Sequence, residues 1–200
     1  VQSAYFEYLV RGWGVRGESW IVDRGRVLAD PATAPEDWDK LLREVLQKSY
    51  PLRDKSGRTM AIRAAGFDSA GAPGVTQQAY AAWIRWVRLA QVRMLGKSSG
   101  REAWSIIPLK GASGINAPRL TVTYPDTARA ANKATGGSVP VAAFNPNSFK
   151  DDLAGQLSRM EPGPLCVHFP WTLRSPEKPH IWFEQLVSEH PVRGRWEKIN

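Results

Sequence analysis

The stretch Met60-Ala-Ile-Arg-Ala-Ala-Gly-Phe-Asp68-Ser-Ala-Gly71 decides the fold prediction, because an apolar run ends there in one carboxylate and then breaks on glycine. This order places an acid at the C-terminal end of a buried strand. Ligands bind at that edge of open α/β sheets, so Asp68 is the first candidate for chemistry. Asp followed by Ser and Gly is also an ordinary turn sequence, and both interpretations stay open at this point.

The segments on either side of this stretch alternate between strand and helix patterns. The predicted elements are, in order, antiparallel strands at 4–11, 18–23 and 26–28 with a turn at Gly25, a helix carrying Trp38 to Leu46, a strand ending at Asp68, a helix from Thr76, a strand at 104–109, strands at 120–123 and 139–144, a helix at about 147–160, a short strand at 163–169 and a helix at 181–189. The region at about 115–144 is a candidate β-hairpin insertion.

Composition favours a single basic domain with a polyanionic partner. The 200 residues include 27 Lys and Arg against 19 Asp and Glu, for a formal charge of +8. The sequence contains no long apolar run, signal peptide or lipidation motif, so we expect no membrane partner and no secretion. Cys166 is the one cysteine, which excludes an internal disulfide and a cysteine-rich zinc site and suits a reducing, cytoplasmic setting.

Three common catalytic motifs fail on mechanism. Leu95-Gly96-Lys97-Ser98 resembles the end of a phosphate-binding loop, but the earlier glycine is missing and no strand precedes it, so no ATP site is expected. The three histidines, His168, His180 and His190, are too scattered to predict a zinc site. No Gly-x-Ser-x-Gly elbow is present. Carboxylates that hold hard divalent cations remain.

The order of elements is that of the ribonuclease H-like fold. Three antiparallel strands, a helix, a parallel strand, a helix and a further strand predict an α/β domain with a central mixed sheet and flanking helices. In that fold a central strand beside the first one carries an acid at its tip. Asp68 occupies this place in the predicted order.

Four segments make the chain similar to the nuclease domain of a tailed-phage terminase large subunit of the lambda type. They are Gly12-Trp-Gly-x-x-Gly-Glu-Ser-Trp-Ile-x-Asp23, Phe67-Asp-Ser-Ala-Gly71, Ile107-Pro-Leu-Lys-Gly-Ala-Ser113 and Val167-His-Phe-Pro170. Phe183-Glu-Gln-Leu-x-x-Glu189 near the end is also similar. The first and third segments are the more specific ones, and together the segments span nearly the whole chain.

The resemblance implies a DNA endonuclease that cuts concatemeric viral DNA during packaging into procapsids. It further implies two-metal hydrolysis with Mg²⁺ or Mn²⁺, in which one ion activates water and the other stabilises the leaving oxygen. Double-stranded DNA, the terminase ATPase domain, the small terminase subunit and the portal are the implied partners, in the host cytoplasm. The ATPase domain is expected outside residues 1–200.

Candidate site residues follow from matching the segments to this chain. Asp68 is the expected central metal ligand, Lys110 a catalytic phosphate contact, and Glu7 a catalytic acid or nearby metal ligand. Glu184 and Glu189 are further candidate metal ligands, each also compatible with a helix surface. The resemblance places two more acids directly before Val1 and beyond Asn200. The candidate DNA-binding cations are Lys110, Arg85, Arg88, Arg93, Lys97 and Arg101.

Two alternatives stay open. The same fold would also serve a non-catalytic DNA-binding or assembly module, or a resolvase- or transposase-like nuclease. Metal-dependent nicking that Asp68→Asn abolishes would exclude the first alternative. A strong preference for branched or end-specific DNA over linear duplex would indicate the second.

Overall fold

The computed structural model describes residues 4–98, 101–125, 138–173 and 181–199. These residues form two compact units. The first unit comprises Val1–Tyr8, Gly25–Gly111 and Leu120–Phe144, and the second comprises Leu9–Arg24, Ala112–Arg119 and Asn145–Asn200. The prediction of a single domain over residues 1–200 stays a prediction.

Two long strands open the chain where the sequence predicts three short ones. β1 (Tyr5–Trp13) and β2 (Ser19–Leu28) are joined through the short helix η1 (Val15–Gly17). Gly25 lies inside β2, where a Cβ would lie 2.8 Å from the hydroxyl oxygen of Tyr8. The glycine therefore makes room for a ring and does not form a turn. The prediction of three antiparallel strands at this end is wrong.

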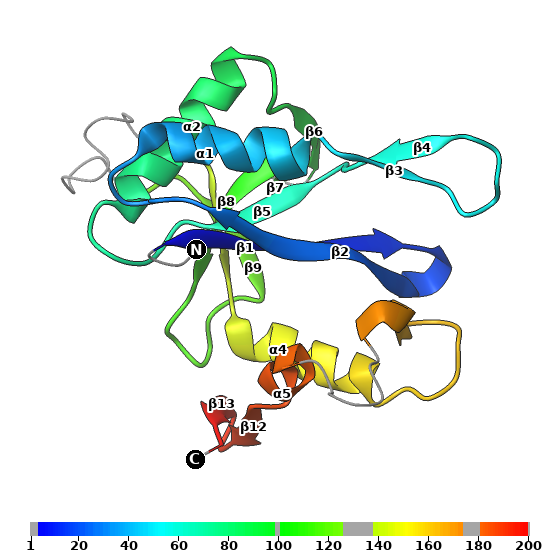
Figure 1. The fold of residues 1–200 in the computed structure, drawn as a ribbon. Helices are drawn as coiled ribbons and strands as arrows, with labels where there is room; N and C mark the ends of the chain where they lie inside the picture. Colours follow the sequence, from blue (N-terminus) through cyan, green and yellow to red (C-terminus); the bar gives the residue numbers. More distant parts are fainter. Residues whose placement is uncertain (1–3, 99–100, 126–137, 174–180, 200) are drawn as a thin grey trace. The chain divides into compact units, whose positions relative to one another are not determined.

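A four-stranded sheet forms the centre of the first unit (Figure 1). Its strands, in spatial order, are β5 (Ala65–Asp68), β8 (Ile106–Gly111), β10 (Val141–Phe144) and β9 (Leu120–Thr123). β5 and β10 pair parallel with β8, and β9 pairs antiparallel with β10. Strands β9 and β10 of the expected insertion thus form a hairpin that also extends this sheet.

The mixed α/β class is confirmed, whereas the ribonuclease H-like arrangement is not. β1 and β2 form a separate sheet in the order β1-β2-β11, and β11 (Val167–His168) runs parallel to β2. The predicted strand ending at Asp68 is split as well. Its first part, β4 (Thr59–Ala61), pairs antiparallel with β3 (Ser49–Pro51), and only β5 joins the central sheet.

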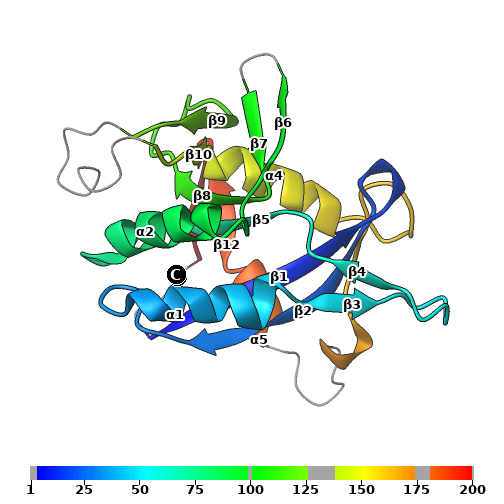
Figure 2. The same ribbon diagram turned by 90° about the horizontal axis from the view of Figure 1, so that it is seen from above.

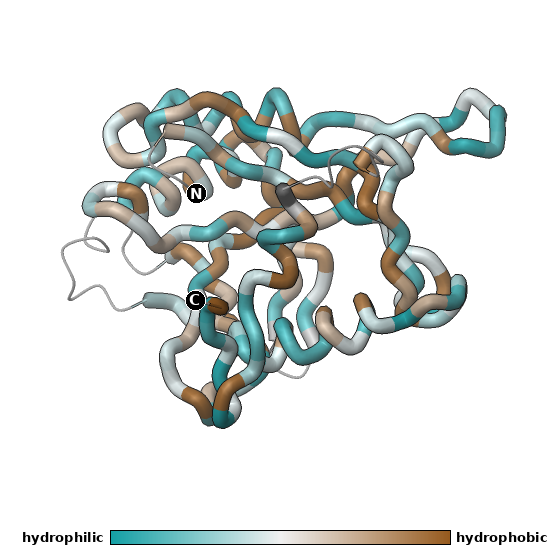
Figure 3. The backbone as a smooth tube through the Cα atoms, turned by 60° about the horizontal axis from the view of Figure 1, so that its bottom comes forward, coloured by the Kyte–Doolittle hydropathy of each residue, from teal (hydrophilic) through white to brown (hydrophobic). Residues whose placement is uncertain are grey.

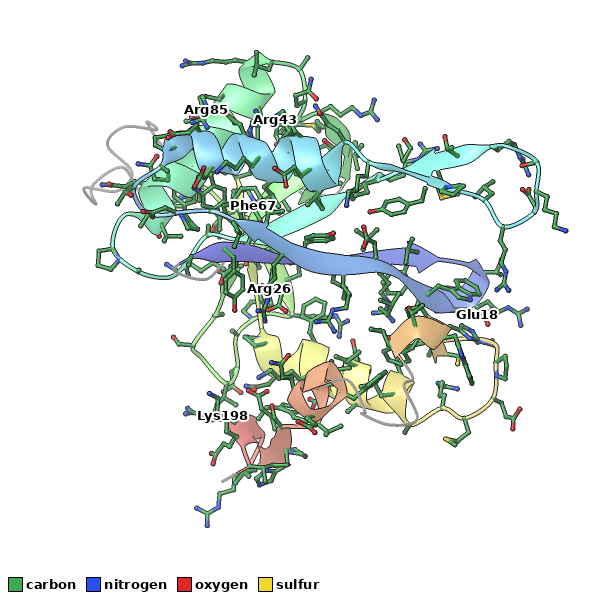
Figure 4. The ribbon with its side chains drawn as sticks, viewed as in Figure 1. Glu18, Arg26, Arg43, Phe67, Arg85 and Lys198 are labelled. Atoms are coloured by element: carbon green, nitrogen blue, oxygen red, sulfur yellow. The ribbon has the colours of Figure 1, made fainter. Side chains whose placement is uncertain are left out.

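Two helices cover one face of the central sheet in the first unit. α1 (Pro35–Leu41) continues into the wider turn η2 (Leu42–Leu46), and α2 spans Val75–Arg88. Phe67 packs edge-on against Trp38 of α1 and Trp86 of α2, with ring centroids 5.4 and 5.7 Å apart. Figure 4 shows Phe67 beneath α1.

These contacts explain why the helical patterns predict α1 and α2 well. The buried stripe of each helix includes a large aromatic ring, and both rings meet the same strand residue, Phe67. The indole of Trp83 adds a hydrogen bond of 2.9 Å to the carbonyl of Ile106 on β8. No helix within the described ranges combines the length and apolar character needed to cross a membrane.

Two hairpins project from the first unit in different directions (Figure 2). One is formed by β3 and β4, and its connecting loop is hydrophilic, as the teal and white colours of Figure 3 show. The other is formed by β6 (Met94–Ser98) and β7 (Arg101–Trp104). The Gly96-Lys97-Ser98 tripeptide thus lies on a strand, and not in a loop before a helix.

The second unit contains α4 (Pro146–Leu157), which confirms the helix predicted near 147–160. Asn145 caps it, because its Oδ1 accepts a hydrogen bond of 3.1 Å from the backbone N–H of Asn147. The other elements of the unit are η3 (Trp171–Leu173), α5 (Ile181–Leu186), β12 (Glu189–Val192) and β13 (Arg195–Lys198). β12 and β13 form an antiparallel hairpin.

Candidate active site

Two exposed polar side chains, those of Asp68 and Lys110, lie at the C-terminal ends of parallel strands. Asp68 is the last residue of β5 and pairs in register with Leu109, and Lys110 follows Leu109 on β8. Because the strands are parallel, both residues lie at the same edge of the sheet. That edge is where sheets of this kind bind ligands. Asp68 therefore has the placement that its sequence context predicts.

The turn after Asp68 is fixed by hydrogen bonds. The carboxylate Oδ1 of Asp68 accepts the N–H of Ala70 at 2.9 Å. The buried Ser69 donates through both its Oγ and its backbone N–H to the carbonyl of Leu109, at 2.9 and 3.0 Å. Thr76 donates to the carbonyl of Ser69 at 2.8 Å. The backbone is thus held in place, while Oδ2 of Asp68 accepts no hydrogen bond from the described residues.

Asp68 and Lys110 project from opposite faces of the sheet. A Cβ on Gly66 would lie 2.6 Å from Cδ1 of Leu109, which shows that the Leu109 side chain covers the face shared by Gly66 and Asp68. Alternation along the strands then places Phe67 and Lys110 on the other face. The flexible stem of Lys110 has to bend around the sheet edge to approach a ligand of Asp68.

Glu7 lies on β1, in the three-stranded sheet β1-β2-β11. Its Oε1 is 3.9 Å from Nε of Arg26, and its neighbour Phe6 is buried while Glu7 is exposed. Within the part of the chain that the structure describes, no three His, Cys, Asp or Glu side chains come close enough to hold an ion. Mg²⁺ and Mn²⁺ need several oxygen ligands, so these carboxylates alone do not make a complete metal site.

Glu184 and Glu189 belong to the second unit. Glu184 is exposed on α5. Glu189 begins β12, where it forms an ion pair with Lys150 of α4, and the helix predicted through 189 ends at Leu186. The roles of the two glutamates as metal ligands stay predictions.

Two of the predicted DNA-binding cations are engaged inside the first unit. Nη2 of Arg85 donates to Oδ1 of Asp39 at 3.1 Å and to the carbonyl of Pro35 at 2.8 Å, which ties α2 to α1 (Figure 4). Lys97 lies 3.2 Å from a carboxylate oxygen of Glu102 across the β6–β7 hairpin. These side chains have intramolecular partners that the sequence did not reveal.

Two others are more open. Arg88 is exposed at the end of α2. Arg93 is exposed before β6 and, with Arg63, lines a hollow of about 230 Å³. Arg101 begins β7, but its side chain lies outside the described residues. The assignment of all these cations to DNA binding stays a prediction.

One polar cluster in the second unit was missed by the sequence reasoning. Nε2 of His168 lies 2.7 Å from Oε1 of Glu18, and the same oxygen accepts the N–H of Gly163 at 3.1 Å. The imidazole also stacks on Trp20, with ring centroids 5.0 Å apart. Glu18 and His168 stand in two of the four segments that carry the resemblance, and that shared membership was the available signal.

The comparisons with known proteins agree with this resemblance. The family described as the terminase large subunit gpA, endonuclease domain, matches residues 1–200. Neither the curated proteins nor the solved structures that were compared give a match. The family match covers the whole chain and supports a nuclease role in DNA packaging. The chain therefore belongs to the family of terminase large subunit gpA endonuclease domains.

Proposed function

We propose that this chain is a metal-dependent DNA endonuclease domain that cuts concatemeric viral DNA during packaging, with Asp68 as one oxygen ligand of the metal. The observation that carries the proposal is the exposed Asp68 carboxylate at the end of a parallel strand, with a fixed backbone and an Oδ2 that accepts no hydrogen bond within the described part of the chain. Membership of the endonuclease family supports the nuclease part. Lys110, at the neighbouring strand end, would contact a phosphate.

The metal would be Mg²⁺ or Mn²⁺, because hard cations prefer carboxylate oxygens. Two ions, as the resemblance implies, require more carboxylates than Asp68 alone. The expected acids before Val1 and after Asn200 would supply some of them. Glu7, Glu184 and Glu189 remain candidates for the rest.

The proposed substrate is double-stranded DNA, in keeping with the formal charge of +8. The proposed protein partners are the terminase ATPase domain, the small terminase subunit and the portal, and the proposed location is the host cytoplasm. Phosphate contacts by lysine and arginine do not read base sequence, so we propose that the choice of cutting site depends on another subunit.

A matched pair of substitutions tests the role of Asp68. Asp54 lies in the β3–β4 loop and makes the same local turn, since its Oδ1 accepts the N–H of Ser56 at 3.0 Å. The assay follows nicking of a supercoiled plasmid with Mg²⁺ or Mn²⁺, by a protein extended at both ends. We expect Asp68→Asn to lower the nicking rate at least about 100-fold. Loss of a residue that only hydrogen-bonds a metal ligand already lowers activity by up to that factor, and Asp68 would be a ligand itself. Asp54→Asn should cut at the wild-type rate.

The outcomes separate the alternatives. Equal nicking by the two variants would make Asp68 a turn residue and overturn its assignment. DNA binding without any metal-dependent cutting would favour the non-catalytic DNA-binding or assembly module. Strong preference for branched or end-specific DNA over linear duplex would instead favour a resolvase- or transposase-like nuclease.

A further inference from the structure

Arg11 of β1 is a half-buried cation held by neutral partners. Its Nη2 donates to Oγ of Ser19 and to Oε1 of Gln156, both at 2.7 Å. Its Nε is buried and has no hydrogen-bond partner among the residues that the structure describes. Burial lowers the pKa of Arg11 below its ordinary value, since desolvation disfavours the charged form. The guanidinium is therefore oriented, while its charge is not neutralised by these contacts.

The guanidinium of Arg11 lies over the indole ring of Trp13, 4.1 Å from the ring centroid. Trp13 is 62% exposed, which is unusual for so large an apolar side chain. A cation on an aromatic face stabilises both groups by about 0.5–1 kcal/mol at exposed sites. The pair thus presents an oriented positive charge and an exposed aromatic surface side by side.

Two other arginines also lie over aromatic rings, but each of them has a carboxylate partner. Arg26 lies over Tyr5 and is 3.9 Å from a carboxylate oxygen of Glu7. The other pair, formed by Arg119 and Phe149, has an ion pair from Arg119 to Asp152.

Arg11 makes no ion pair with any carboxylate in the described ranges, unlike Arg26 and Arg119. An oriented arginine without an acidic partner is suited to bind an external phosphate, because its planar guanidinium matches phosphate oxygens.

We propose that Arg11 and Trp13 form a contact site for single-stranded DNA, in which the guanidinium binds a backbone phosphate and the indole stacks on an unpaired base. Stacking on an exposed aromatic ring requires a base that is free of its duplex partners, which selects a single strand over a duplex. This inference rests on the proposed DNA-cutting function, since a nuclease that cuts the two strands of a duplex at staggered positions leaves single-stranded ends.

Binding of a fluorescently labelled single-stranded oligonucleotide, followed by anisotropy, tests the site. We expect Trp13→Ala to weaken this binding about tenfold, with a smaller effect on a duplex of the same sequence. Trp13→Phe should retain most of the affinity, because the ring is kept. Arg26→Ala is the matched control, since it removes an arginine from a pair that already has its carboxylate, and it should bind as the wild type does.

Salt dependence tests the phosphate contact. Arg11→Gln should reduce the slope of log K against log salt by about 0.7 for a single strand. Because Arg11 also hydrogen-bonds Ser19 and Gln156, the thermal unfolding of the Arg11→Gln variant must be measured as well. The Trp13 variants do not share this difficulty, since that side chain is largely exposed.

Several results would overturn the site. The proposed site would be wrong if Trp13→Ala bound the single strand with the affinity of the wild type, or if this substitution weakened single-strand and duplex binding equally. It would also be wrong if the wild-type protein did not bind a single strand. Failure of the proposed nuclease function shows separately, as absence of metal-dependent cutting by the wild-type protein, and undiminished cutting by Asp68→Asn would overturn only the assignment of Asp68. That variant should bind single strands normally.

Discussion

Glu18 and His168 stand 150 positions apart in the sequence, and Oε1 of the glutamate lies 2.7 Å from Nε2 of the histidine. The contact joins the residue before β2 to β11, and β11 pairs parallel with β2 in the register His168 to Trp20. The carboxylate also accepts the N–H of Gly163, so one side chain fixes two segments of the second unit. The pair therefore supports the local fold, whatever it contributes to DNA cutting.

Removal of this carboxylate should destabilise the second unit. Glu18→Ala leaves His168 and the N–H of Gly163 without their acceptor, which should lower the free energy of unfolding by about 1–3 kcal/mol. Glu161→Ala, at an exposed glutamate of the same unit, should stay within about 0.5 kcal/mol of wild type. Urea denaturation measures both. A double-mutant cycle with His168→Ala that gives no coupling energy would contradict the role of the pair.

The substitution of two glycines should separate backbone strain from collision. Gly74 and Gly57 both have positive φ, at +95° and +73°, but a Cβ on Gly74 would lie 2.8 Å from the carbonyl oxygen of Ala32 and one on Gly57 would meet nothing within 4 Å. We expect Gly57→Ala to cost about 1–2 kcal/mol from its backbone conformation. Gly74→Ala should cost about 1–3 kcal/mol more, because the Ala32 backbone must move. Equal urea midpoints for the two variants would contradict this explanation.

The sequence predicts the helices better than the strands, and the reason is physical. α1, α2 and α4 carry local patterns, either an apolar stripe or a capping Asn145, that depend little on distant partners. Strand ends depend on which strand pairs with which. Gly25 has the composition of a turn but serves the close approach of Tyr8, which only the paired structure shows.

The candidate site divides in the same way. Asp68 could be placed because its position follows from the local order of an apolar run, an acid and a glycine. The contacts of Glu18 with His168 and of Arg85 with Asp39 join residues that are far apart in the sequence, so no local pattern predicts them. From its charge alone, Arg85 is expected to face solvent or DNA. Composition predicts that cations are present, but not which of them already have partners.

Arg85 and Arg88 should respond differently to the same substitution. Arg85→Ala removes hydrogen bonds to Asp39 and to the carbonyl of Pro35. Because the Arg85 side chain is partly exposed to solvent, we expect a loss of unfolding free energy of only about 1 kcal/mol. Arg88→Ala should leave stability within about 0.5 kcal/mol of wild type.

Duplex binding gives the second measurement for this pair. If Arg88 contacts a phosphate, Arg88→Ala should reduce the salt slope of duplex binding by about 0.9, and Arg85→Ala should leave it unchanged. A reduced slope for Arg85→Ala with unchanged stability would show that Arg85 faces DNA instead of α1.

The hydrogen bond from Tyr124 to Glu102 should make stability fall at high pH. The hydroxyl of Tyr124 donates to the Glu102 carboxylate, which raises the pKa of Tyr124 from 10.0 to about 12 and, together with Lys97, lowers the pKa of Glu102. A phenol with a raised pKa contributes stability that is fully present below pH 10. This contribution is lost as the pH rises through about 12, since the folded state then retains a proton that the unfolded state releases.

Tyr124→Phe should therefore remove the part of the decline in unfolding free energy between pH 10 and about 12 that Tyr124 causes. The same substitution should also reduce the loss of unfolding free energy at acid pH. The lowered pKa of Glu102 contributes stability at pH values above the ordinary pKa of a glutamate, and this contribution is lost as the pH falls through the pKa of Glu102 in the folded state. Urea denaturation across both ranges measures this, and the difference in tyrosinate absorbance between wild type and variant locates the phenol titration. Tyr5→Phe is the control, because Tyr5 contacts Arg26 and no carboxylate bonds it within the described ranges. If the difference spectrum titrates near pH 10, the phenol of Tyr124 is not bonded to Glu102 in solution.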